Sequence, residues 1–387
     1  MTSVHLRHVC VPGSGDDQLL ADVDLDVEEG TTLAVVSPSA ATRAALLRAV
    51  AGLERTATGE ISFGDDDVSA EDPRGRDVSV VFADHALYPH RDVLDNLTAS
   101  ATVRKGTDTE ALAEQVEQVV EQLALSELLD LRPADLTDEQ QQRVALGRAL
   151  VREARLYLFE EPFAAQAERV RPHVRSVVQQ WQVERGRTSL VATASVSEAL
   201  AMADLIAVLH RGRVHQVGTA REVYARPSDL FVASYLGMPP MNLLPGLVHE
   251  GRVETPVGTV ALSQAQIDGV GDRRTVIVGV RPEHCLDATR GGVDVSGGFD
   301  GTTRVDEVEW RGDTQLAFLG FEVEPEVDEA LEAIEEFYGF DLFQHFLVVR
   351  IDAGGELEAG MSMHVVVPPE HVSLFDAQTG ANLAVVD

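Results

Sequence analysis

Apolar and polar positions follow two different periods along the first 237 residues. Short apolar runs of strand length are separated by longer stretches in which apolar residues recur every three or four positions, as on one face of a helix. The runs predicted as strands are residues 4–11, 20–27, 32–36, 59–63, 77–82, 156–159, 189–193 and 205–209. The stretches predicted as helices are one that contains Leu46 and Val50 and ends at Gly52, then 109–125, 138–151, 170–184 and 196–202. This alternation predicts a mostly parallel sheet covered by helices on both faces.

The pattern changes near residues 237–240, where Gly-Met-Pro-Pro marks the expected domain boundary. Beyond it, short strands at 276–280, 347–351 and 364–367 are separated by Gly, Asp and Pro, which predicts a small β-barrel. Residues 322–346 differ, because an apolar stripe runs through an acidic stretch and predicts an inserted helix. Such a helix covers a core more often than it recruits a partner. The expected stripe consists of Val327, Ala330, Leu331, Ile334 and Phe337.

Charge changes the picture of where the protein works. The chain of 387 residues has 64 acidic and 31 basic residues, a net charge of -33, and its single lysine is Lys105. This excess favours a salt-rich cytoplasm, in which charge repulsion is screened, over ordinary acidic solubilisation. It also argues against a nucleic-acid partner, which needs basic patches. Cys10 and Cys285 are expected to be free thiols in a reducing compartment. Because the sequence shows no signal segment and no apolar span, we expect the chain to be soluble and to reach a membrane only by docking.

Residues 37–45 lie between a predicted strand and a predicted helix, where phosphate-binding loops occur. The pattern of such a loop is G-x-x-x-x-G-K-[ST], in which glycines open the backbone to phosphate, the lysine meets the outer phosphates and the hydroxyl binds magnesium. Here Ser37 and Thr42 stand at the two glycine positions, Arg43 at the lysine and Ala44 at the hydroxyl. The neighbouring loop positions Ser39, Ala40 and Ala45 belong to the same degenerate loop.

Several ordered segments give the chain a specific resemblance. They are LLRAVAGLE at 46–54, ALYPH at 86–90, QQQRVALGRAL at 140–150, Gly-Thr at 218–219, PPMNLLPG at 239–246 and GVRPEH at 279–284. With these, the chain resembles the ATP-binding subunits of ABC importers of the maltose and glycerol-3-phosphate type. The resemblance implies an α/β fold with an ABC-type P-loop core over 1–237, including a helical subdomain at about 84–153. It also implies a small all-β, oligonucleotide-fold-like regulatory domain over 238–387, with the acidic insertion at about 322–346.

In that family, two subunits sandwich two ATP molecules with magnesium, and each site joins the phosphate loop of one subunit to the signature loop of the other. The resemblance assigns most of the contacts to substituted positions. The aromatic residue that stacks on adenine falls near Ser14, the glutamine on Ala83, the magnesium aspartate on Glu160, the catalytic base on Glu161 and the switch histidine on Ala194. Among these positions, only Glu161 has the same residue as the family. Glu160 replaces the family's aspartate with a longer carboxylate, which still offers magnesium an oxygen.

The signature loop, Leu-Ser-Gly-Gly-Gln in the family, is substituted as well. It runs from Leu136 to Gln140, and Asp138 and Glu139 replace the two glycines that would expose helix amides to phosphate. Thr137 and Gln140 have the spacing of a capping box, so the helix is expected to satisfy its own amino end. Phosphate would therefore meet carboxylates here instead of amides.

These substitutions favour a catalytically impaired importer subunit with a structural or regulatory role. Two alternatives stay open: a slow but genuine ATPase that uses Arg43, Glu160 and Glu161, and a dimerising regulatory module that acts through the C-terminal domain. For Glu161 we favour a structural, sheet-end carboxylate over a working base. For Arg43, a solvated surface arginine and a weak anion contact are left open.

The resemblance also implies partners. The subunit would lie at the cytoplasmic face of the membrane against permease subunits, as a homodimer or paired with an intact ATPase paralogue. The region that receives the permease helix maps to Ala86, Leu87, Tyr88, Pro89 and Leu94, and we favour docking over ordinary packing there. His5 and His8 are expected to have no third ligand nearby, which argues against a metal site.

Overall fold

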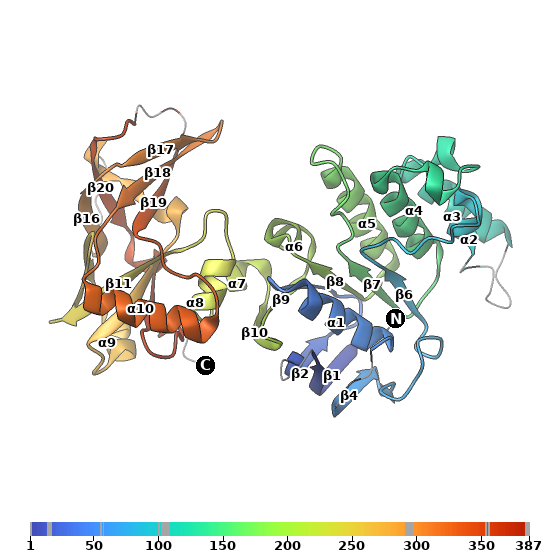
Figure 1. Ribbon diagram of the computed structural model, residues 1–387, viewed down its shortest axis with the longest axis horizontal. Helices are drawn as coiled ribbons and strands as arrows, with labels where there is room; N and C mark the ends of the chain where they lie inside the picture. Colours follow the sequence, from blue (N-terminus) through green and yellow to red (C-terminus); the bar gives the residue numbers. More distant parts are fainter. Residues whose placement is uncertain are drawn as a thin grey trace. The chain divides into compact units, whose positions relative to one another are not determined.

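The computed structural model describes residues 2–13, 18–54, 56, 58–99, 101, 109–290, 297–352, 354 and 357–383. The chain forms two compact units, residues 1–220 and 221–387 (Figure 1). The boundary expected at 237–238 stays a prediction. Among the described residues, no helix is both long enough and apolar enough to cross a membrane.

The centre of the first unit is a six-stranded sheet in the order β10-β9-β3-β8-β7-β6. Its strands β9, β3, β8, β7 and β6 are parallel, and β10 joins the edge antiparallel. Their bounds are β3 Thr32–Val36, β6 Val78–Val81, β7 Leu156–Glu160, β8 Ser189–Thr193, β9 Leu205–His210 and β10 Arg213–Gly218. The prediction of a mostly parallel sheet is confirmed.

A second, antiparallel sheet in the first unit has the order β2-β1-β4-β5. Its strands are β1 Val4–Pro12, β2 Gln18–Val27, β4 Thr58–Phe63 and β5 Asp66–Asp67. The helix α1 (Ala40–Ala51) packs into one core with residues of both sheets. Gly52 ends α1 in the left-handed conformation, as its position after the apolar stretch predicted.

The other face of the parallel sheet is covered by helices. Alternate residues of β7 show the two layers, because Leu156 and Leu158 lie in the core with α1, whereas Tyr157 and Phe159 lie in the core under the helices. These helices are α2 Val93–Thr98, α3 Thr109–Gln122, α4 Asp138–Val151 and α5 Arg171–Arg185; the short helices α6 Val196–Met202 and α7 Ala220–Ala225 follow in the chain. The strands 32–36 and 189–193 and the helices 138–151 and 196–202 have the predicted bounds. The helix α3 ends before 125 because Ala124 adopts a left-handed backbone (φ 51°).

The second unit is mainly β structure. Eight strands form a sheet in the order β15-β20-β16-β13-β12-β11-β14-β21, and β17-β18-β19 form a three-stranded sheet. The bounds are β11 Asn242–His249, β12 Arg252–Thr255, β13 Gly258–Ala261, β14 Thr275–Val280, β15 Leu286–Asp287, β16 Gly298–Arg304, β17 Glu307–Trp310, β18 Thr314–Gly320, β19 Phe346–Asp352, β20 Ser362–Val367 and β21 Val372–Asp376. Apolar residues from both sheets share one core. The helices are α8 Leu230–Tyr235, α9 Gln264–Val270 and α10 Pro325–Tyr338.

The inserted acidic helix predicted between 322 and 346 is α10, but two members of its predicted apolar stripe, Ala330 and Phe337, are exposed. Leu331, Ile334 and Tyr338 are buried, whereas Phe337 is 67% exposed. Seven residues make almost two complete helical turns, so Tyr338 lies on the same face as Leu331 and Phe337 is turned away from it.

Candidate functional site

The parallel sheet brings three of the predicted site segments to one edge. In the register of the sheet, Val36 pairs with Thr193, and Glu160 pairs with Ala192. Ser37, Glu161 and Ala194 directly follow the carboxyl ends of β3, β7 and β8. Neighbouring parallel strands therefore place the loop at 37–45 beside the candidate base, at the edge where open α/β sheets bind ligands.

Three backbone donors at the start of α1 have acceptors within the loop. The hydroxyl of Ser39 accepts a hydrogen bond from the N–H of Thr42 (3.1 Å), and the N–H of Arg43 donates to the carbonyl of Ser39 (3.2 Å). The N–H of Ser39 in turn donates to the hydroxyl of Ser37 (3.3 Å). The amides of Ser39 and Thr42 are thus bonded to side-chain oxygens of the loop itself.

Arg43 crosses the site and binds the candidate catalytic base. Its guanidinium donates to Oε1 of Glu161 from Nη2 at 2.6 Å and from Nε at 3.1 Å, and Nη1 donates to the carbonyl of Ser37. The Arg43 side chain is 7% exposed and that of Glu161 is 22% exposed. The interpretation of Arg43 as a solvated surface arginine is therefore wrong, because its charge is buried against an internal carboxylate.

The carboxylate of Glu161 has further partners from β8. The N–H of Ala194 donates to Oε1 at 2.9 Å, and the hydroxyl of Thr193 lies 3.3 Å from Oε2. Thr193 is also 3.1 Å from the carboxylate of Glu198, so its single proton is shared between two acceptors. Burial raises the pKa of the Glu198 carboxyl. The backbone of Glu161 is left-handed (φ 45°), a conformation that non-glycine residues adopt at a cost and that often marks functional positions.

The start of α4, to which the resemblance assigns a second phosphate contact, is capped by its own side chains. The predicted capping box is present: the hydroxyl of Thr137 accepts from the N–H of Gln140 at 3.3 Å, and the side chain of Gln140 accepts from the N–H of Thr137 at 2.9 Å. Asp138 bonds to Nε2 of the buried His85 at 2.9 Å. Glu139 lies near Arg143 one turn later (4.0 Å).

Gln142 links α4 to the loop that follows the candidate base. Its Nε2 donates to the carbonyl of Glu161 at 3.0 Å, and its Oε1 accepts from the N–H of Ala165 and from the side chain of Gln166. No role was predicted from the sequence for Gln142, His85 or Thr193. Gln142 stood within the quoted segment at 140–150, whereas no pattern in the sequence distinguished His85 or Thr193.

The remaining predicted contact positions offer little to a nucleotide. Ala83 and Ala194 have only methyl side chains, and Ala44 and Ala45 lie on α1 without a hydroxyl. The position near Ser14 lies outside the described residues. Glu160 is half-buried, and among the described residues its carboxylate makes no hydrogen bond or ion pair. Of the hydroxyl, glutamine and aspartate positions that the family uses for magnesium, only Glu160 carries an oxygen ligand here, so this set offers the ion a single carboxylate.

The segment expected to dock a permease helix keeps an exposed apolar character. Tyr88 is 48% exposed and Leu94 is 43% exposed, whereas Leu87 packs against the core under the helices. The side chain of Asn96 binds the backbone of this segment, through Tyr88 and Arg91, and holds its shape.

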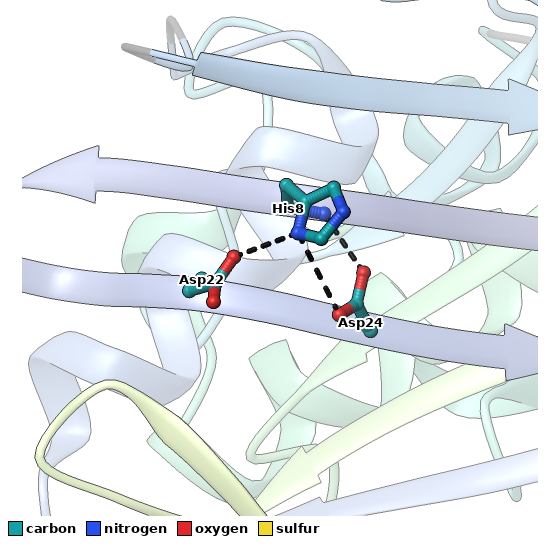
Figure 2. Close-up of side chains that lie close together, drawn as sticks. All are labelled: His8, Asp22 and Asp24. Carbon is teal, nitrogen blue, oxygen red and sulfur yellow. Dashed lines mark hydrogen bonds and ion pairs between the residues drawn. The ribbon is translucent and has the colours of Figure 1, made fainter.

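A three-residue polar cluster lies on the antiparallel sheet (Figure 2). Nδ1 of His8 is 2.9 Å from Oδ1 of Asp22 and 3.9 Å from Oδ2 of Asp24, and the N–H of His8 donates to Asp24 at 2.8 Å. The hydrogen bond with Asp22 and the charge of Asp24 raise the pKa of His8. The expectation that His8 has no further ligand-type neighbours is wrong. All three residues are exposed, and the ion pairs account for their arrangement without a metal.

Comparisons with known proteins agree with the architecture. The family model described as "ABC transporter" matches residues 20–164, and the one described as "MalK OB fold domain" matches residues 237–285. A solved structure of the dimeric ATP-binding cassette MJ0796 bound to ADP and Pi covers 56% of this chain and 99% of its own, with a TM-score of 0.52 and 23% identity, a likeness of fold.

Curated relatives match almost the whole chain. The xylose/arabinose import ATP-binding protein XacJ of Haloferax volcanii is 34% identical over 95% of this chain and 92% of its own. The sn-glycerol-3-phosphate import ATP-binding protein UgpC of Chromohalobacter salexigens is 35% identical over 93% and 90%. The trehalose import ATP-binding protein SugC of Mycobacterium tuberculosis is 31% identical over 100% and 99%. The chain belongs to the family of ABC importer ATP-binding subunits, with an ABC transporter ATPase domain followed by a MalK-type OB domain.

Proposed function

We propose that this chain is a subunit of an ABC-type carbohydrate importer that supports the transporter without turning over ATP itself. It would sit at the cytoplasmic face of the membrane against the permease. The relatives named for import of xylose and arabinose, glycerol-3-phosphate and trehalose support the substrate class.

The observation that carries the proposed impairment is the internal pair between Arg43 and Glu161. The cation that would meet phosphate is already neutralised, and the carboxylate that would activate water already accepts from Arg43 and Ala194. Phosphate binding would have to break a buried, charge-assisted contact before gaining one of its own. No reaction step through ATP or magnesium is assigned to this chain.

The signature helix supports the same conclusion from the other side of a dimer. In a paired arrangement it would face the partner's nucleotide, yet its first turn has Asp138 and Glu139, and its amino end is capped by Thr137 and Gln140. Negative charge at this place repels the γ-phosphate of a bound nucleotide. An intact paralogue would therefore receive a poor second half-site from this chain, which favours a structural role in either a homodimer or a heterodimer.

The test is ATP binding and hydrolysis by the full chain in high salt with magnesium. We expect no magnesium-dependent ATP binding at millimolar concentration, and phosphate release that is equal for the wild type, Glu161→Gln and the control Glu168→Gln, which changes an exposed glutamate in the following loop. Turnover that Glu161→Gln abolishes while Glu168→Gln preserves it would overturn the proposal and establish the slow ATPase.

The docking surface has a separate test. We expect Leu94→Asp to weaken recovery of permease subunits with the tagged chain from membranes of its own organism, because a charge replaces an exposed apolar contact. Val183→Asp is the matched control, since Val183 is also apolar and is 81% exposed on α5, outside the proposed surface. Equal recovery of both variants with the permease would contradict this docking surface.

A further inference from the structure

The C-terminal unit contains a cavity of about 690 Å³ between α10 and the strands β11, β12 and β14. In Figure 1, α10 is the orange-red helix beside the label of β11. The volume of the cavity lies within the range of roughly 300–1,000 Å³ that is usual for small-molecule sites. The cavity lies in the second unit, and the nucleotide-type site in the first.

The floor of the cavity is the outer face of the sheet. Leu244, Val276 and Val278 point into the core of the second unit, so the alternating residues Pro245 and Ile277 point to the opposite face, toward α10. Leu247, on the same face, is 53% exposed. On the helix side, Ala330 and Leu331 face the cavity. The interior is thus apolar.

The cavity stays open because α10 is held at its other end. Tyr338 is buried and its hydroxyl donates to the carbonyl of Thr379, and the ring of Phe340 packs edge-on against Phe231 of α8. The carboxylate of Glu335 accepts from the N–H groups of residues 342 and 343, each at 2.8 Å. These contacts fix the C-terminal end of α10, while the small side chain of Ala330 leaves space under its first half.

The lining of the cavity is acidic. Glu254, Glu322, Glu324 and Glu326 line it, and no arginine, lysine or histidine of the described chain does so. Among the described residues, none of these four carboxylates has an ion-pair partner. Glu324 and Glu326 lie at the amino end of α10.

We propose that this cavity binds an organic cation with an apolar body, such as an alkyl or aromatic amine. The apolar body occupies the space between Ile277, Ala330 and Leu331, and the ammonium group lies among the carboxylates. A small-molecule amine is favoured over a peptide because the apolar space is a single compartment of ligand size.

The experiment uses three probes with one ring system and different charge. Binding of 1-naphthylmethylamine, 1-naphthylmethanol and 1-naphthylacetate to the full chain is measured by titration calorimetry at low and high salt. We expect the amine to bind about tenfold more tightly than the alcohol at low salt, a difference of about 1.4 kcal/mol. The acetate is expected to bind most weakly, and salt should reduce the preference for the amine.

Variants separate the apolar and charged parts. Ala330→Trp fills the cavity and should abolish binding of both amine and alcohol. Glu322→Gln with Glu324→Gln should remove the preference for the amine while leaving the alcohol unchanged. The control Glu329→Gln removes an exposed carboxylate of α10 that does not line the cavity and should bind like the wild type. Circular dichroism confirms that each variant is folded.

Three results would overturn the proposal. One is absence of amine binding to the wild type at amine concentrations up to about 10 mM, which would detect even a weak small-molecule site. Another is amine binding that Ala330→Trp leaves unchanged, and the third is equal affinity for the amine and the alcohol at low salt. A lysine-rich peptide that binds while the amine does not would assign the surface to a protein partner instead.

Discussion

The buried pair of Arg43 and Glu161 makes a prediction about folding that does not depend on nucleotide. If the pair is a built-in structural contact, removing either partner destabilises the first unit, and removing both costs less than the sum of the two single changes. The perturbations are Arg43→Met, which keeps the apolar stem of the side chain and removes the guanidinium, and Glu161→Gln, which keeps the shape of the carboxylate.

The burial of the two side chains sets the magnitude. Arg43 is 7% exposed, so Glu161→Gln leaves a buried cation with neutral acceptors only, which are the new side-chain amide oxygen and the carbonyl of Ser37. Breaking a fully buried pair costs about 3–5 kcal/mol. Because Glu161 is 22% exposed, we discount this to about 2–3 kcal/mol for Glu161→Gln. Arg43→Met should cost about 1–2 kcal/mol, since Glu161 keeps its bond from the N–H of Ala194. The expected coupling energy is about 1–2 kcal/mol.

Urea unfolding of the full chain measures these energies. The chain has two tryptophans, and Trp181 is buried in the core of the first unit, whereas Trp310 in the second unit is 62% exposed. The fluorescence change is therefore dominated by unfolding of the unit that contains the pair. The matched control is the pair Arg155 and Asp66, which is 2.9 Å apart but 35% and 68% exposed, and its cycle should give a coupling of no more than about 0.5 kcal/mol.

A coupling energy as small as that of the surface pair would contradict a structural role for the buried pair. It would mean that Arg43 and Glu161 are independent in solution, and Arg43 would then be available to an anion. A large coupling that millimolar ATP abolishes would also count against the proposed function, because it would show that nucleotide competes successfully for Arg43.

Three further predictions concern other parts of the chain. Thr137→Ala should destabilise the first unit by about 1 kcal/mol in urea unfolding, since it removes the acceptor that caps α4. The raised pKa of His8 stabilises the fold fully below its unfolded value of 6.5, and this contribution is lost as the pH rises through the folded pKa. The melting temperature of His8→Gln should therefore fall below that of the wild type at mildly acidic pH and match it at high pH. Burial alone would raise the pKa of Asp376, but the bonds from Arg273 and from the N–H groups of residues 378 and 379 lower it to about 2. Asp376→Asn should therefore destabilise the second unit at neutral pH. The difference in stability between wild type and variant should vanish as the pH falls from 3.8 through about 2.

Local patterns in the sequence were enough to predict most elements of the first unit. The continuous apolar runs at 32–36 and 189–193 are fully buried central strands, and the spacing of Thr137 and Gln140 predicted a capping box that is present. These features depend on residues within a few positions of one another. The interactions that form these features can therefore be predicted from the sequence.

Contacts between residues far apart in the sequence could not be predicted from such local patterns. The partner of Arg43 is 118 positions away, and only the parallel register of β3, β8 and β7 brings it close. The sequence analysis left a solvated arginine and an anion contact open for Arg43, and its internal partner was neither of these. The contacts of His8 with Asp22 and Asp24 could not be predicted for a related reason. The register of β1 with β2 shifts between Leu6 and Val9, and the alternation of apolar and polar residues does not show where such a bulge lies.

The two helix starts that face phosphate in this family share one chemical property in this chain. At α1, the hydroxyl of Ser39 and the carbonyl of the same residue accept from the first-turn amides, and at α4 Thr137 and Gln140 close the amino end. A single reversion such as Arg43→Lys would restore a compact charge but would leave both caps and the carboxylate of Asp138 in place. Because anion binding at a helix start depends on free amides as well as on charge, we expect that such a variant does not regain ATP binding. Recovery would require glycines in both loops together with the lysine.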